Sequence, residues 1–184
     1  MTTKLKLRNK SRKQEIQTAK ELGGKTTIAS GALVQKGDVF NDYFLVECKT
    51  TEKSFYSLKK SIWDKIQKEA LNSNMRIPVM RIDIYDMFET DRKSYAVLRE
   101  SDFTVFCYGK HTYCLHTVEV DNASFRIADR GLHLVNSPII TGNAYAIDRS
   151  LLVVIDWSDF LILAREYCDE MTEEVSEDGS ENGI

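Results

Sequence analysis

The chain has 184 residues, of which 42% are hydrophobic and 29% charged, and its formal net charge is −3. This length can bury a hydrophobic core, so we expect one domain with an appendage. No apolar run approaches the roughly 20 residues of a membrane-spanning helix, and the polar, basic residues 1–13 do not fit a signal peptide. The four cysteines are scattered, which favours reduced thiols and a cytoplasmic protein, in the host cytoplasm if the source is a virus.

Positive charge is concentrated in the first part of the chain. Residues 1–100 carry 20 Lys and Arg against 13 Asp and Glu, whereas residues 101–184 carry 5 against 15. Neutralisation of phosphates supplies most non-specific nucleic-acid affinity, so the basic part suits a polyanionic substrate. An ordinary solvated surface with an acidic tail would give the same counts, and charge alone does not decide between the two.

The chain begins with a basic segment. Six basic residues precede the first acid: Lys4, Lys6, Arg8, Lys10, Arg12 and Lys13. We interpret residues 1–10 as a mobile arm that can track a nucleic-acid backbone, and a disordered terminus is the alternative. The pattern then predicts a helix over residues 11–22, in which Ser11 and Gln14 are spaced as a capping box and after which two glycines follow.

A predicted strand from Tyr43 to Lys49 carries an acid and a lysine. The segment is apolar and β-prone, and side chains of a strand alternate between two faces. Glu47 and Lys49 therefore point to one face, while Phe44 and Val46 point to the other.

A turn before this strand brings a second acid to it. If Asn41 and Asp42 are the two-residue loop of a β-hairpin, Asp38 lies on the face of Glu47, one diagonal neighbour away. Mg²⁺ prefers carboxylate oxygens together with water and phosphate oxygens, and a metal held there can position a water against a phosphodiester. We expect Asp38 and Glu47 to hold the metal and Lys49 to orient the water or offset the growing negative charge. A solvated hairpin face is the alternative interpretation.

The spacing of these residues resembles the PD-(D/E)xK nuclease superfamily. Asp38 is followed after eight residues by Glu47-Cys48-Lys49, with Gly37 where that pattern often has a proline. The run is more narrowly similar to archaeal-type Holliday-junction resolvases and their phage relatives, and the similarity covers about residues 10–85.

The resemblance implies a fold, a cofactor and further site residues. The fold is α/β, a restriction-endonuclease-like core with a mixed sheet in the order α-β-β-β-α-β. The cofactor is Mg²⁺, for which Mn²⁺ can substitute. A glutamate of the N-terminal helix completes the metal site, and Glu15 matches that position better than Glu21. Ser30, in Ser30-Gly31-Ala32, would lie beside the metal and a phosphate.

The pattern after the hairpin reaches the same order independently. Residues 54–74 show apolar residues at three- and four-residue steps, which predicts an amphipathic helix, and Ile77–Ile84 predicts a strand. A strand, helix and strand imply a parallel crossover, so we expect the nuclease core to span residues 11–90. The helix also carries Lys59, Lys60 and Gln67, which we expect to contact DNA, and a solvated helix face is the alternative.

Residues 91–169 predict a β-rich extension that ends in a helix over residues 157–171. Short strands are expected at residues 95–98, 104–108 and 151–155. The acidic residues 170–184 are expected to be disordered. A zinc site would need four crowded ligands, and we do not favour it because they lack the separated pairs of structural sites: Cys107, His111, Cys114 and His116.

The charge pattern and the cluster of acids favour a Mg²⁺-dependent DNA endonuclease, and the resemblance implies a structure-selective one, a Holliday-junction resolvase of DNA recombination or repair. A nuclease of the same fold acting on nicks, flaps or other DNA, and a non-catalytic DNA-binding module, are the alternatives. Two symmetric cuts need two copies, so we expect a homodimer. Its interface, or alternatively a satellite core, would use apolar residues that follow the core: Tyr85, Met87, Phe88, Phe125, Leu132, Leu134, Ile139, Ile140, Phe160, Leu161 and Leu163.

Overall fold

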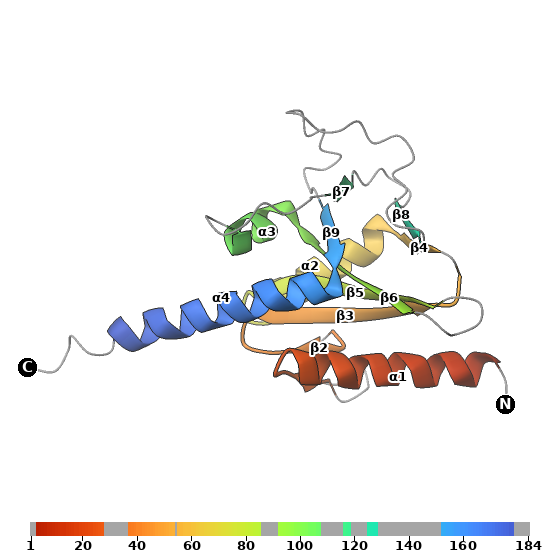
Figure 1. Cartoon of the computed structure of the whole chain (residues 1–184), viewed down its shortest axis with the longest axis horizontal. Coiled ribbons are helices and arrows are strands. Elements are labelled where there is room, and N and C mark those ends of the chain that lie inside the picture. Colours follow the sequence, from red (N-terminus) through yellow and green to blue (C-terminus); the bar gives the residue numbers. More distant parts are fainter. Residues whose placement is uncertain are drawn as a thin grey trace, which may run out of the picture.

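The computed structural model describes residues 3–27, 37–53, 55–85, 92–107, 116–118, 125–128 and 152–178 (Figure 1). The helices are α1 (Thr3–Glu21), α2 (Lys60–Asn72), α3 (Glu100–Cys107) and α4 (Trp157–Asp178). The strands are β1 (Lys25–Thr26), β2 (Val39–Phe40), β3 (Phe44–Thr51), β4 (Phe55–Leu58), β5 (Ile77–Tyr85), β6 (Arg92–Arg99), β7 (His116–Val118), β8 (Phe125–Ala128) and β9 (Leu152–Asp156). The fold is mixed α/β: one large mixed sheet has the order β1-β2-β3-β5-β6-β9-β7, and β4 pairs with β8.

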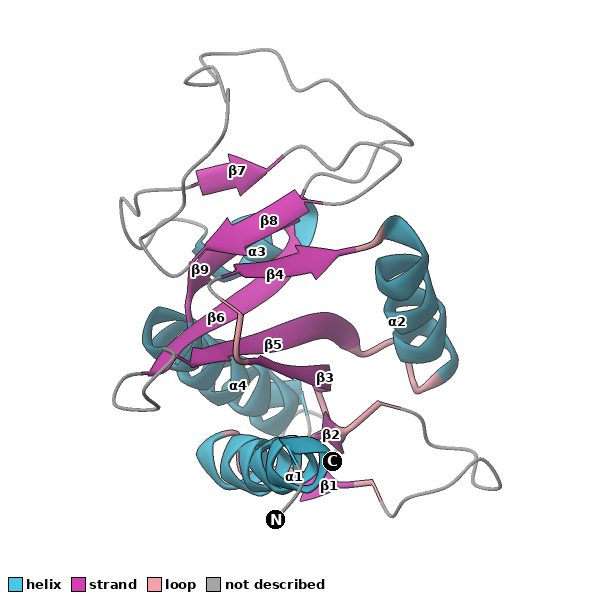
Figure 2. Ribbon diagram, turned by 90° about the vertical axis from the view of Figure 1, so that its right-hand side faces the viewer, coloured by secondary structure: helices cyan, strands magenta, loops and turns pink. Residues whose placement is uncertain are grey.

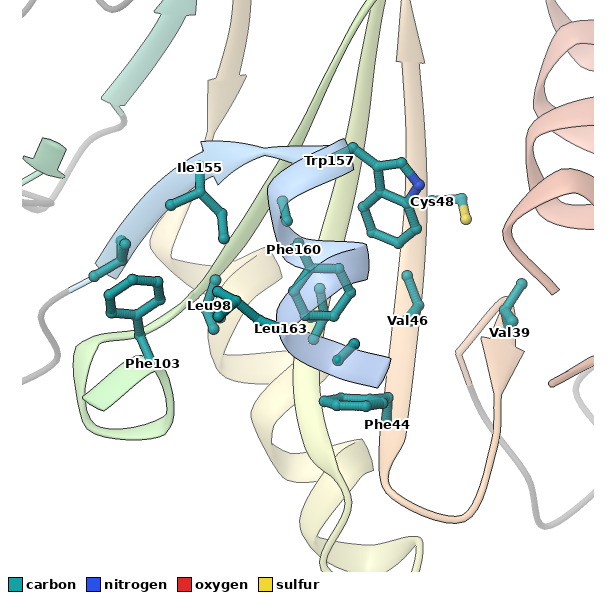
Figure 3. Packing of buried hydrophobic residues seen from close by; sticks show 14 of the residues in the cluster. Val39, Phe44, Val46, Cys48, Leu98, Phe103, Ile155, Trp157, Phe160 and Leu163 are labelled. Atoms are coloured by element: carbon teal, nitrogen blue, oxygen red, sulfur yellow. The ribbon is translucent and has the colours of Figure 1, made fainter. Parts of the chain in front are cut away.

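The large sheet separates two hydrophobic clusters, because successive strand residues point to opposite faces. On one face, Phe44 and Val46 of β3 pack with Phe160 of α4 (Figure 3). On the other face, Met80 of β5 packs in a second cluster with Trp63 of α2. Figure 2 accordingly shows α2 on the side of the sheet opposite α4. The predicted alternation along β3 is therefore confirmed for its buried residues.

Helix α1 begins earlier than the sequence pattern indicated. It starts at Thr3 rather than Ser11, so the capping-box interpretation is wrong, and residues 3–10 are helical rather than a mobile arm. Lys and Arg are good helix formers, and a capping-box pattern inside a helix-prone run does not start a new helix. The end of the helix is as predicted, since Gly23 adopts the left-handed φ of +61° that commonly ends helices.

The β2–β3 hairpin has a different register from the one predicted. Phe40 pairs with Leu45, because Asn41 Oδ1 accepts the backbone amides of Tyr43 and Phe44 at 3.0 and 2.7 Å. An Asn side chain that binds amides two and three residues ahead builds its own turn. The turn is thereby shifted by one residue and the strand register by two.

The predicted order α-β-β-β-α-β is present, with one strand added. Strands β1, β2 and β3 form an antiparallel meander, and β3 pairs with β5 in parallel across α2. The first residues of the predicted second helix are instead β4, and α2 begins at Lys60. Phe55 and Leu58, three residues apart, fitted the helical spacing, but Phe55 and Tyr56 are β-prone and pair with β8.

The predicted extension continues the large sheet. Strand β6 pairs with β5, and β9 pairs with β6, so both add to the core sheet. Residues 104–107 are the end of helix α3 and not a strand, with Glu100 and Asp102 as favourable acids in its first turn. Helix α4 continues to Asp178, so residues 170–178 are helical rather than disordered.

Residues proposed for a dimer interface are partly core residues. Phe160 and Leu163 are 0% and 1% exposed, and Leu161 packs against the same cluster. These three residues are core residues, as the alternative interpretation expects. They belong to the main core on one face of the large sheet and not to a separate satellite core. Met87, Phe88, Leu132, Leu134, Ile139 and Ile140 lie outside the described residues. Within the part of the chain that the structure describes, the helices are too short or too polar to cross a membrane.

Candidate functional site

Asp38 lies beside the middle of β3 and is anchored to it. Its backbone amide donates to the carbonyl of Val46 at 3.0 Å, and its Oδ2 accepts the backbone amide of Cys48 at 2.7 Å. The observed register, continued by one residue, places Asp38 across from Glu47 rather than diagonal to it. The shifted turn therefore brings the two acids closer than the predicted hairpin would.

Gly37 precedes this acid in a conformation that proline cannot adopt. Its φ is +83°, whereas the proline ring holds φ near −65°. A Cβ at this position would also lie 2.8 Å from Leu45 Cδ1. The departure from the proline of the resembled pattern thus has a local structural reason.

Glu47 and Lys49 are joined across the exposed side of β3. Lys49 Nζ donates to Glu47 Oε1 at 2.5 Å. The side chain of Lys49 is 31% exposed and that of Glu47 is 13% exposed. Residues i and i+2 of a strand share a face, which is why the two meet. The predicted convergence of two carboxylates and one ammonium group is therefore present in the structure.

The charges of this cluster shift its pKa values. Burial and the neighbouring negative charge of Glu47 raise the pKa of Asp38 to about 6, against a smaller opposing effect of the Cys48 amide. Burial disfavours the charged form of Lys49, but the charge of Glu47 and its hydrogen bond outweigh that and raise the pKa of Lys49. A carboxyl that titrates near neutral pH next to a second acid is typical of a functional site.

Glu15 and Glu21 have separate environments. Glu15 Oε2 is paired with Arg12 Nη1 at 2.8 Å, and the charge of Glu15 contributes to the raised pKa of Asp38. Glu21 Oε2 instead accepts hydrogen bonds from Arg81 Nη1 at 2.6 Å and Trp157 Nε1 at 2.8 Å. Of the two glutamates, Glu15 is the one whose charge acts on Asp38.

Gln14 fastens helix α1 to the strand of the site, a role the sequence did not reveal. Its side chain is 1% exposed, donates to the carbonyl of Lys49 at 3.1 Å and accepts the hydroxyl of Thr50 at 2.7 Å. The sequence does not reveal this role because a polar residue such as Gln14 in a helix is expected to be solvent-exposed unless its partner on another element is known.

Tyr56 is a second residue that sequence reasoning did not single out. Burial raises its pKa, Lys49 opposes this and Glu47 adds to it, so the phenol interacts electrostatically with the site. Tyr56 lies on β4, a segment for which the sequence pattern predicts a helix.

The residues predicted to bind DNA are placed unequally. Lys59 is exposed just before α2, but Lys60 is held by Asp64 at 2.9 Å, which offsets its charge. Gln67 is half-buried on the same helix. Ser30 lies outside the described residues, as do His111 and Cys114 of the disfavoured zinc set.

The donor set of the site fits a hard divalent cation in part. Asp38 and Glu47 offer carboxylate oxygens. Burial and, after it, the negative charge of Glu47 raise the pKa of Asp38, and a bound cation would favour its ionised form. Among the described side chains, however, no group of three or more His, Cys, Asp or Glu is close enough to enclose a metal ion. One carboxylate oxygen of Glu47 is engaged by Lys49, and one of Glu15 is engaged by Arg12.

Comparison with models of known protein families, and with curated proteins, finds no match to this sequence.

Proposed function

We propose that this protein is a Mg²⁺-dependent, structure-selective DNA endonuclease with a restriction-endonuclease-like core. The observation that carries the proposal is the cluster of Asp38, Glu47 and Lys49, assembled by the register of the β2–β3 hairpin. The Asp-x₈-Glu-x-Lys spacing and the α-β-β-β-α-β order support it independently. A four-way junction is the substrate that the resemblance favours.

Each residue has a role that follows from its environment. Asp38 and Glu47 would hold Mg²⁺, which supplies activation of a water and stabilisation of charge on the phosphate. Asp38 is ionised only above about pH 6, and its Oδ2 is oriented by the Cys48 amide. Lys49 carries its proton at neutral pH, as lysines ordinarily do, and its raised pKa favours that state further, so it can donate hydrogen bonds to the water or phosphate.

A second candidate function is supported by the pairing of the acids. If Glu47 stays bound to Lys49 and Glu15 to Arg12, the cluster remains a structural ion-pair network. The protein would then be a DNA-binding module without catalysis. A metal-dependent cleavage assay separates the two functions.

The experiment uses the purified chain with labelled four-way junction, nicked, flapped and linear DNA, each with Mg²⁺, Mn²⁺ or a chelator. The proposal expects Mg²⁺-dependent cleavage, with the junction cut fastest. Cleavage of another structure would keep the nuclease and change its substrate. Binding to DNA without cleavage under any of these conditions would establish the non-catalytic module.

A further inference from the structure

The outward face of α1 is the most strongly basic helix face among the described residues. Its exposed positions between residues 7 and 21 are four cations, one amide and one apolar residue: Arg8, Asn9, Arg12, Lys13, Ile16 and Lys20. At 100° per residue these six lie within an arc of about 140°, so they form one continuous face. We call this set the α1 basic face.

The other two long helices do not offer a comparable surface. The exposed charges of α2 are Asp64, Lys65 and Lys68, and Asp64 also binds Lys60. The described exposed charges of α4 are Arg165 against Asp169, Glu170 and Glu173. Of the three helix surfaces compared, the α1 basic face therefore has the largest excess of positive charge.

The helix that carries the α1 basic face is hydrogen-bonded to the strand of the candidate site. Arg12, on this face, pairs with Glu15, whose charge acts on Asp38. The neighbouring Gln14 points inward and binds the backbone of Lys49. One helical turn thus presents cations to solvent and is tied to the catalytic strand on its other side. Figure 1 shows α1 along the outside of the sheet beside β2 and β3.

We propose that the α1 basic face binds the phosphate backbone of duplex DNA and leads it to the Asp38–Glu47–Lys49 site, an inference that rests on the proposed function. Arg8 to Lys20 spans about 18 Å of helix at 1.5 Å per residue. The face carries four cations along this length, so it can neutralise at most about four phosphates. This assigns the main DNA contact to one helical face of α1, whereas the sequence pointed to a mobile arm over residues 1–10 and to Lys59, Lys60 and Gln67 of the α2 region.

The test compares two matched pairs of exposed lysines. Lys13→Gln/Lys20→Gln removes two charges from the α1 basic face, and Lys65→Gln/Lys68→Gln removes two from α2. Both are built on Asp38→Asn, and the Kd for a labelled duplex is measured over a series of salt concentrations. The first pair should weaken binding and make the slope of log K against log salt shallower by about 1.8, while the second leaves it unchanged. Arg8→Gln alone should reduce the slope by about 0.9.

Several outcomes overturn the assignment. An unchanged slope for Lys13→Gln/Lys20→Gln, or an equal loss for the α2 pair, would show that the α1 basic face does not carry the contact. Charge-sensitive binding to phosphatidylserine vesicles without DNA binding would assign it to a membrane instead. Cleavage by the chain with native Asp38, measured in parallel, keeps the two proposals distinct. If the chain cleaves DNA but Lys13→Gln/Lys20→Gln leaves the salt slope unchanged, only the role of the α1 basic face is refuted. If this pair makes the salt slope shallower but the chain does not cleave DNA, only the proposed nuclease activity is refuted.

Discussion

Asp38 Oδ2 accepts a hydrogen bond of 2.7 Å from the backbone amide of Cys48. Cys48 separates Glu47 from Lys49, so this bond attaches the first acid to the strand residue that lies between the other two members of the site. The side chain of Cys48 points to the opposite, buried face of β3, where it packs in the hydrophobic core and not with Asp38, Glu47 and Lys49. The acid of one strand is thus positioned by the backbone of the next, and the following predictions depend on that arrangement.

Asp38→Asn and Glu47→Gln should each abolish cleavage while DNA binding persists or tightens. Each change keeps the size of the side chain and removes a metal-ligand charge that also repels phosphate. Asp42→Asn, at an exposed acid in the turn of the same hairpin, is the matched control and should cleave normally. Mg²⁺-dependent cleavage retained in both site variants would eliminate the assignment.

Lys49→Ala should lower the single-turnover rate on the order of 10²-fold or more, with little change in DNA affinity. The reason is that its ammonium group acts on the reacting phosphate or water rather than on the DNA backbone at large. Lys53→Ala, at an exposed lysine just beyond β3, serves as the control. An unchanged rate for Lys49→Ala would reduce this lysine to a partner of Glu47.

Glu15→Gln should reduce cleavage, whereas Glu21→Gln should reduce the stability of the fold. Glu21 bridges Trp157 and the fully buried Arg81, so Glu21→Gln should lower the free energy of unfolding by about 1–3 kcal/mol, measured by urea denaturation. Glu15→Gln should leave stability nearly unchanged and reduce cleavage. Loss of cleavage with Glu21→Gln in a fully folded protein, and not with Glu15→Gln, would mean that Glu21 is the third acid.

The free energy of unfolding should fall as pH rises from about 4 to 6. In the folded protein the Asp38 carboxyl keeps its proton up to about pH 6, whereas its ordinary pKa is 3.8. Between these values the folded state binds more protons than the unfolded state, so stability present below pH 4 is lost by pH 6, by up to about 3 kcal/mol. Asp38→Asn should remove this dependence, and denaturant titrations over that pH range measure it.

The same carboxyl should make metal binding pH-dependent, since its ligating form is the ionised one. Mg²⁺ affinity should rise through about pH 6 in the native protein. A pH-independent stability curve that Asp38→Asn does not alter would contradict both expectations.

We propose that the protein acts as a homodimer, because one site makes one cut and a junction needs two. Phe160 and Leu163 cannot supply the interface, since both are buried in the core. Light scattering at micromolar concentration should give twice the chain mass with and without a junction. A monomer in both conditions would favour a nuclease of another DNA structure.

Apart from strand β4, the order of elements in residues 11–85 was predictable from local pattern, as were the site residues on β3. Alternation along Tyr43–Lys49 placed Glu47 and Lys49 together because a strand has a fixed period of two. The end of α1 at two glycines, and the parallel crossover across α2, followed from equally local rules. No distant contact was needed for any of these.

Tertiary structure alone decided the partners and the extent of the core. The hairpin register was decided locally, by a turn in which Asn41 binds the amides of Tyr43 and Phe44, but the strand pattern does not show that turn. The environment of Glu21 is set by Arg81 and Trp157, residues 60 and 136 positions away. Gln14 likewise became a buried contact only through Lys49 and Thr50 on another element. Sequence periodicity shows which face a side chain takes, but the partner it meets there is chosen by packing between distant segments.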